Sequence, residues 1–217
     1  MFAEKYDVFL FDLDGVIVTT DQYHYKAWKK MADEEKINFD KTINERLRGV
    51  SRMESLEIIL EKSEKKYSNL EKVELAERKN NYYKEFLQCV TPKDILPGVL
   101  KILHGLKEKG IKIAVGSSSK NTPIILERIG LERFFDAVAD GNSIKNSKPD
   151  PEVFLLAAKM LGTKPEDCVV VEDAEAGVEA ALSGGMKAVG VGSATNCSKA
   201  DYKASSMEFI SIDELLM

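Results

Sequence analysis

Cysteine is scarce in this sequence. The three cysteines, Cys89, Cys168 and Cys197, lie far apart and are odd in number, so they match neither a disulfide framework nor a zinc site. Cys168 begins the apolar run 168–171, which favours a buried structural thiol. A sequence without a disulfide pattern is typical of a reducing compartment, and we expect this protein to be cytoplasmic.

A long hydrophobic run and an excess of positive charge are also absent. No stretch approaches the about 20 apolar residues that a membrane-spanning helix requires, and the first residues lack the basic and apolar segments of a signal peptide. The net charge is −5, and the basic residues are scattered. These features argue against a nucleic acid or an acidic membrane as partner, but they leave room for a small anionic substrate.

The residues that are present predict an α/β protein. The chain of 217 residues is 44% apolar and 31% charged, which suits a globular protein with one good-sized core. After a short buried strand at 8–11, helical spacing without a convincing strand continues to residue 89. Strands then alternate with helical segments, at 111–115, 135–139, 168–171 and 188–191. The pattern predicts a doubly wound, Rossmann-like parallel sheet from residues 1–16 and 90–217, with a helical domain inserted at 17–89.

The first strand ends in an acidic motif. The apolar run 8–11 leads directly into Asp-Leu-Asp-Gly at 12–15, so Asp12 and Asp14 follow the carboxyl end of the strand. Ligands bind at that edge of open α/β sheets, where two carboxylates can serve as nucleophile and general acid/base. A calcium loop or a solvated turn is the alternative, and a calcium loop needs further oxygen ligands at regular spacing and a late glutamate. An apolar Val-Ile-Val follows instead, which favours catalysis.

Three later segments carry residues of the kind that bind phosphate or a metal. They hold Ser117, Lys148, and the pair Glu172 and Asp173. Because the carboxyl ends of parallel strands lie at one edge, we expect these side chains to converge on Asp12. Carboxylates suit Mg²⁺, while a hydroxyl and a lysine suit a phosphate. Singly, each residue has an ordinary structural explanation, such as a turn cap or a surface lysine. Together they predict a phosphoryl-transfer site.

In order along the chain, these segments resemble the four motifs of the haloacid dehalogenase superfamily. The motifs are the stretch 12–16, Ser117, Lys148 with Pro149, and the stretch 172–177, and the resemblance covers essentially the whole chain. The helical insert resembles the α-helical cap of that superfamily. The resemblance implies a Mg²⁺-dependent enzyme in which Asp12 becomes phosphorylated and Asp14 acts as general acid/base.

A second group of segments is similar to the β-phosphoglucomutase family within that superfamily. They are 20–24 with Trp28, 47–55, 78–80 and 119–121. Members of that family interconvert β-glucose 1-phosphate and glucose 6-phosphate through a bisphosphate. The resemblance implies an isomerase that acts on a sugar phosphate, and the short loops suggest a monomer. A sugar-phosphate phosphatase of the same superfamily is the alternative, whereas the presence of Asp12 disfavours a non-catalytic binding protein.

The resemblance also implies the roles of the other site residues. The metal site would consist of Asp12, Asp14 through its backbone carbonyl, Glu172 and Asp173. The transferring phosphoryl group would be held by Ser117 and Lys148. The distal phosphate of the sugar would be held by Arg52, Ser119, Lys120 and Asn121. The cap, its hinge and its substrate contacts would involve Thr20, His24, Trp28, Gly49 and Lys79.

Two positions depart from the family pattern. Thr19 stands where relatives often carry an acidic residue, which concerns a hinge contact and not the chemistry. Ser118 stands where the mutases tend to have alanine. The extra hydroxyl lies beside the expected phosphoryl site, where it either alters substrate contacts or has no effect.

Overall fold

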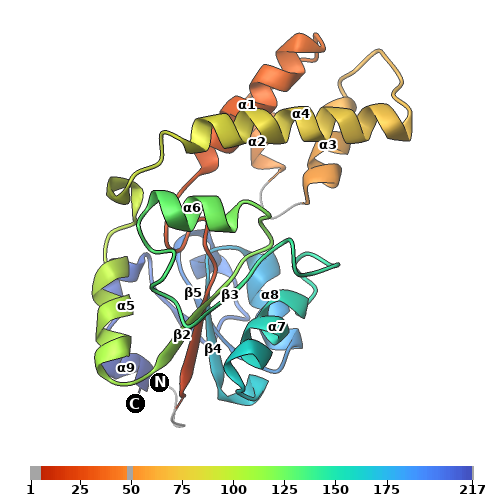
Figure 1. Cartoon of the computed structure of the whole chain (residues 1–217). Coiled ribbons are helices and arrows are strands. Elements are labelled where there is room, and N and C mark those ends of the chain that lie inside the picture. The colour runs from red at the N-terminus through yellow and green to blue at the C-terminus, as the bar shows by residue number, and fades with distance from the viewer. Residues whose placement is uncertain (1–5, 48–50, 217) are drawn as a thin grey trace. The chain divides into compact units, whose positions relative to one another are not determined.

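The computed structural model describes residues 6–47 and 51–216 of the chain. They form two compact units, both of which are seen in Figure 1. The core unit consists of the described residues up to Thr19 together with those from Thr91 onward. The cap unit extends from Thr20 to Val90.

The core unit is built on a six-stranded parallel sheet. Its strands are β1 (Val8–Phe11), β2 (Lys112–Gly116), β3 (Ala137–Ala139), β4 (Cys168–Glu172), β5 (Lys187–Gly190) and β6 (Tyr202–Lys203). Their order in space is β3-β2-β1-β4-β5-β6, and each neighbouring pair is parallel. Because β1 is central and covered on both faces, all four of its side chains are buried. This explains its uninterrupted apolar sequence.

Helices cover both faces of this sheet. The core unit contains α5 (Val99–Glu108), α6 (Thr122–Arg128), α7 (Glu152–Leu161), α8 (Glu175–Ser183) and α9 (Ile212–Leu216). Helices α7 and α8 contact each other and pack against the face that presents Val8 and Leu10. Helix α5 contacts β2 and α9, and Figure 1 shows these two helices on the other side of the sheet. Short 3₁₀ turns occur at Pro92–Asp94, Pro165–Asp167, Gly192–Asn196 and Met207–Phe209.

The cap unit is helical throughout its described part. Its helices are α1 (Asp21–Glu34), α2 (Lys41–Glu45), α3 (Arg52–Leu60) and α4 (Asn69–Leu87). Helices α3 and α4 each begin with a capping box, in which Ser51 pairs with Glu54 and Ser68 with Glu71. These reciprocal bonds satisfy backbone groups at the helix start that have no partner within the helix. Trp28, Met31 and their neighbours give the unit its own apolar core.

The predicted doubly wound parallel sheet with a helical insert is confirmed, and all five predicted strands are present with ends within two residues of those expected. Strand β6 and helix α2 were not predicted, because two and five residues are too short to show a period. Cys168 is buried as predicted, and burial raises the pKa of its thiol to about 12. Over residues 6–47 and 51–216, no helix is both long and apolar enough to cross a membrane.

Candidate active site

The carboxyl edge of the sheet places Asp12 beside Glu172. In the sheet register, Phe11 of β1 pairs with Val171 of β4, so the residues that follow them stand next to each other. The backbone N–H of Asp12 extends the ladder by donating to the carbonyl of Val171 at 3.0 Å. Both carboxylates are buried, with 8% of Asp12 and 1% of Glu172 exposed. Two acidic groups thus share a site from which water is largely removed.

Lys148 joins these two carboxylates. Its Nζ lies 2.5 Å from Oδ1 of Asp12 and 2.5 Å from Oε1 of Glu172, and only 10% of its side chain is exposed. The two negative charges raise the pKa of the Lys148 ammonium despite its burial, so it remains charged. Of the residues expected to converge on Asp12, Lys148 and Glu172 are therefore found beside it.

The remaining negative charge of the site makes it suitable for a cation. Carboxylate oxygens of Asp12, Glu172 and Asp173 all lie within 4.8 Å of one another, and one ammonium cannot balance three carboxylates. Burial, followed by the charges of Glu172, Asp12 and Asp14, raises the pKa of Asp173 to about 8. Oxygen donors gathered at this spacing fit a hard divalent cation, which would relieve the repulsion between them.

Two glycines allow the acidic groups to approach so closely. A Cβ atom at Gly15 would lie 2.2 Å from Oδ2 of Asp173, and Gly15 has a φ of +93°, which an L side chain rarely adopts. A Cβ atom at Gly177 would lie 1.9 Å from Oε1 of Glu172. Helix α8 therefore packs directly against the Glu172 side chain. Both glycines belong to the motifs recognised in the sequence.

Phe154 of α7 contacts Lys148 and was not predicted from the sequence. Its ring lies 4.6 Å from Nζ of Lys148, and a Cβ atom at Gly116 would lie 2.6 Å from the same ring. The aromatic face thus stabilises the lysine ammonium and needs a glycine at the end of β2. An apolar residue on an amphipathic helix carries no sequence signal for this contact.

The loop after β2 holds the predicted phosphate-binding hydroxyl groups. The hydroxyl of Ser117 accepts the N–H of Ser119 at 3.2 Å, and the hydroxyl of Ser119 accepts the N–H of Asn121 at 3.2 Å. Ser117 and Asn121 are buried, whereas Lys120 is exposed. These bonds hold the loop in a tight turn that ends at the start of α6.

The cap unit has a second cluster of predicted residues. Lys79 is 2% exposed, and its Nζ lies 2.8 Å from Nδ1 of His24. The His24 ring stacks on Tyr83 with ring centroids 3.9 Å apart, and Lys79 also lies 4.7 Å from the centre of the Trp28 ring. Burial and then the Lys79 charge lower the pKa of His24 well below its usual value. His24 is therefore neutral, and its Nδ1 accepts the bond from Lys79.

Thr20 and Arg52 complete the described part of the cap cluster. The hydroxyl groups of Thr20 and Tyr83 are 2.6 Å apart and buried. Arg52 is the first residue of α3, directly after the cap residue Ser51, and partial burial lowers its pKa. The structure thus brings Thr20, His24 and Lys79 together through the Tyr83 ring. Gly49, the remaining predicted hinge residue, lies outside the described residues.

Comparison with known proteins gives consistent relatives. The family model of haloacid dehalogenase-like hydrolases matches residues 6–185. A β-phosphoglucomutase of Bacillus subtilis is 50% identical over 185 residues, which are 84% of this chain and 82% of the relative. A phosphorylated carbohydrates phosphatase of Thermotoga maritima is 34% identical and is matched over 95% of both chains.

The fold comparison agrees with the sequence comparison. The crystal structure of a β-phosphoglucomutase from Clostridium difficile matches with a TM-score of 0.89 and 45% identity, covering 97% of this chain and 95% of that one. The resemblance seen in the sequence motifs is thereby confirmed. This chain belongs to the haloacid dehalogenase-like hydrolase family and, within it, groups with the β-phosphoglucomutases.

Proposed function

We propose that this protein is a Mg²⁺-dependent β-phosphoglucomutase. It interconverts β-D-glucose 1-phosphate and glucose 6-phosphate through a phosphorylated Asp12 and a glucose 1,6-bisphosphate intermediate. The observation that carries the proposal is the 50% identity to a β-phosphoglucomutase over 84% of the chain. The buried Asp12, in contact with Lys148 and beside a carboxylate cluster, supplies the chemistry that such a reaction needs.

Asp12 acts as the nucleophile. Its free carboxylate oxygen attacks the phosphorus of a sugar bisphosphate, and the bond from phosphorus to the sugar oxygen breaks. Asp14 gives a proton to that departing oxygen. In the second half of the cycle Asp14 removes a proton from the 6-hydroxyl of an incoming glucose 1-phosphate, which takes the phosphoryl group as the bond from phosphorus to Asp12 breaks, and the bisphosphate forms again. Asp14 lies two residues after Asp12 on the same turn, which suits two groups acting on one phosphorus.

Charge neutralisation supports this transfer. Ser117 and Lys148 hold the oxygens of the transferring phosphoryl group, and the Lys148 ammonium already lies against the attacking carboxylate. Asp12, Glu172, Asp173 and the backbone carbonyl of Asp14 would hold Mg²⁺, which would supply further positive charge to neutralise the phosphoryl group. Family members use such an ion, and the acidic cluster of this chain has suitable ligands.

A mutase must also hold the phosphate that is not reacting and exclude water from the phosphorylated aspartate. We assign the distal phosphate to Arg52, Ser119, Lys120 and Asn121. We assign the cap, its hinge and its sugar contacts to Thr20, His24, Trp28, Gly49 and Lys79. A neutral His24 fixed by Lys79 carries its proton on Nε2, where it can donate to a sugar hydroxyl.

The decisive experiment supplies β-D-glucose 1-phosphate, Mg²⁺ and a catalytic amount of glucose 1,6-bisphosphate. Glucose 6-phosphate, measured with a coupled dehydrogenase, should appear in large excess over free phosphate. Asp12→Asn should abolish the reaction, and Asp14→Asn should abolish mutase turnover while leaving the fold intact. Continued turnover of either variant would refute the assigned roles.

A sugar-phosphate phosphatase is the second candidate. It is supported by the 34% identity to a phosphorylated carbohydrates phosphatase across 95% of the chain. In that case, the assay above would release phosphate at the rate at which the sugar phosphate is consumed, without isomerisation. For either activity we propose a cytoplasmic monomer that binds neither nucleic acid nor membrane, which size-exclusion chromatography and fractionation can test.

A further inference from the structure

Lys148 lies in an irregular loop between β3 and α7. The loop leaves β3 at Ala139 and returns to regular structure only at Glu152, the first residue of α7. Lys148 must nevertheless hold its ammonium 2.5 Å from Asp12. A lysine side chain has four rotatable bonds. Its ammonium is therefore held at one position only if the backbone that carries it is fixed.

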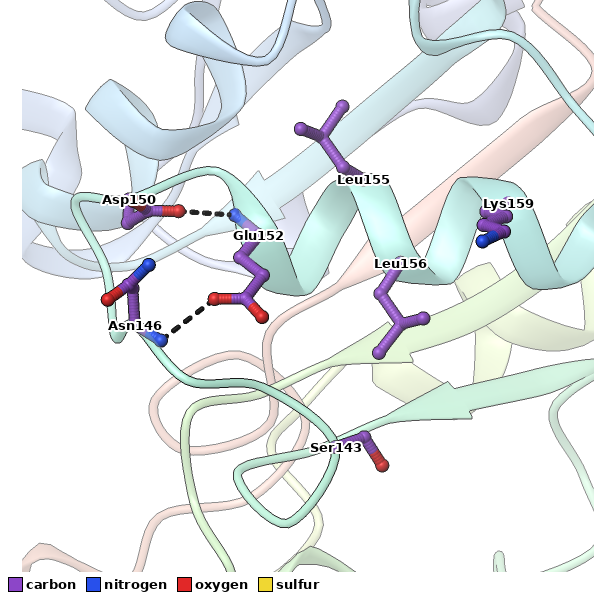
Figure 2. A pocket seen from close by; sticks show the side chains of 7 residues that line it. All are labelled: Ser143, Asn146, Asp150, Glu152, Leu155, Leu156 and Lys159. Carbon is purple, nitrogen blue, oxygen red and sulfur yellow. Dashed lines mark hydrogen bonds between the residues drawn. The ribbon is translucent and has the colours of Figure 1, made fainter.

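One end of this loop is fixed by α7. The Glu152 carboxylate accepts the N–H groups of Lys145 at 3.0 Å and Asn146 at 2.8 Å, while Asp150 caps the N–H of Glu152 at 2.9 Å. Figure 2 shows the Asn146–Glu152 and Asp150–Glu152 contacts beside a surface pocket of about 400 Å³. The residues that line this pocket include no predicted site residue.

The other end of the loop follows the serine turn after β2. The N–H of Gly141 donates to the carbonyl of Ser119 at 3.2 Å, and the side-chain amide of Asn142 donates to the carbonyl of Lys120 at 3.0 Å. A Cβ atom at Gly141 would lie 2.3 Å from the Ser118 carbonyl oxygen, so the two backbones are in direct contact.

Between these two anchors, one side chain of the serine turn reaches the backbone of Lys148. The hydroxyl oxygen of Ser118 accepts the N–H of Lys148 at 3.4 Å. We propose that Ser118 is a positioning residue that fixes the backbone of Lys148 and thereby aims its ammonium at Asp12 and the transferring phosphoryl group. This rests on the proposed function, and it gives a structural purpose to a hydroxyl that the family pattern does not require.

The hydroxyl itself, and not the size of the side chain, is responsible for this contact. Ser118→Ala removes the acceptor and leaves the rest of the turn unchanged, because the bonds of Gly141 and Asn142 go to backbone carbonyls. Ser118→Thr keeps an acceptor. A purely structural role in the turn would lower stability without a selective effect on Lys148.

The test compares wild type, Ser118→Ala and Ser118→Thr by nuclear magnetic resonance and kinetics. Labelling serine carbonyls with ¹³C and lysine amides with ¹⁵N selects the Ser-Lys pairs of the sequence, which end at Lys120, Lys148 and Lys199. The Lys120→Arg and Lys199→Arg variants each lack one of the three signals, which identifies the signals of Lys120 and Lys199. The remaining signal belongs to Lys148. The signal of Lys199, which pairs with Glu179 on the surface, is the internal control.

In Ser118→Ala, the Lys148 amide signal should shift and its hydrogen exchange should become faster, while the Lys199 signal stays in place. The kcat should fall by about tenfold with little change in KM, as for the loss of a supporting contact around a reactive group. Ser118→Thr should restore both. An unchanged Lys148 signal, or an unchanged kcat, overturns the proposal. If the wild type shows no mutase activity, the proposed function fails, whereas the amide signals still decide whether Ser118 holds Lys148.

Discussion

Replacing Lys148 by methionine should destabilise the metal-free protein because it leaves two buried carboxylates without their ammonium. Asp12 and Glu172 have side chains that are only 11% and 2% exposed, and each lies 2.5 Å from Nζ of Lys148. Removing one member of a buried ion pair costs about 3–5 kcal/mol. For a chain of this size, that lowers the Tm by about 6–20 °C.

The pH dependence of this loss gives a sharper criterion. Burial raises the pKa of the Glu172 carboxyl and the Lys148 charge lowers it, so removal of the ammonium should raise this pKa further. The folded variant then binds more protons than the unfolded chain, so its stability relative to wild type should improve as the pH falls from 8 to 5. Mg²⁺ should restore part of the stability at pH 8 if the cluster holds the ion.

The assay is thermal unfolding in EDTA, followed by circular dichroism and by tryptophan fluorescence. Trp28 is the one tryptophan of the sequence and lies in the cap unit, so its signal separates cap unfolding from core unfolding. Lys199→Met is the matched control, since Lys199 pairs with Glu179 on the surface, where an ion pair contributes less than about 1 kcal/mol. A loss for Lys148→Met no larger than for this control would refute the reasoning.

Three further outcomes are expected. The raised pKa of Asp173, about 8 against 3.8 in an unfolded chain, means that the unfolding free energy of the metal-free protein falls as the pH rises from 4 to 8. Asp173→Asn should reduce this slope in urea titrations, and an unchanged slope would contradict the assignment. Tyr83→Phe should cost about 1 kcal/mol of cap stability, read from Trp28 fluorescence, because Thr20 loses a buried partner. Tyr82→Phe is its control, because the hydroxyl of this half-buried ring donates to Glu34 at a solvent-exposed position. Gly177→Ala should weaken Mn²⁺ binding by about tenfold or more, measured by electron paramagnetic resonance, because its methyl group would displace the carboxylate that β4 presents.

The positions of the main strands and helices along the chain were predictable because they depend on local sequence. A continuous apolar run followed by Asp-Leu-Asp-Gly predicts the strand β1 and the turn after it, and Ser51 with Glu54 predicts the start of α3. The alternation of strands and helices after residue 99 predicts the parallel sheet. That topology brings Asp12 and Glu172 to one edge, so their proximity could be expected before any contact was known. Lys148 reaches the same edge from the loop between β3 and α7.

Elements that depend on distant neighbours were not predictable. Strand β6 has two residues and exists because Gly190 of β5 offers it a partner. Phe154 contacts Lys148 and Gly116, which are distant in sequence, through packing that its own helix does not encode. The contact between the hydroxyl of Ser118 and the backbone N–H of Lys148 was also not predictable, because it joins two loops that are distant in sequence.

By itself, the sequence determined the fold class, the order of the strands along the chain and the chemical groups available for phosphoryl transfer. These follow from hydrophobic periodicity and from residue types at strand ends, which are properties of short segments. Only the tertiary structure decided the charge states of those groups and the side chains that contact them. The raised pKa of Asp173, the neutral His24 and the ammonium shared by two carboxylates all arise from burial and from charges that the fold brings within a few ångströms.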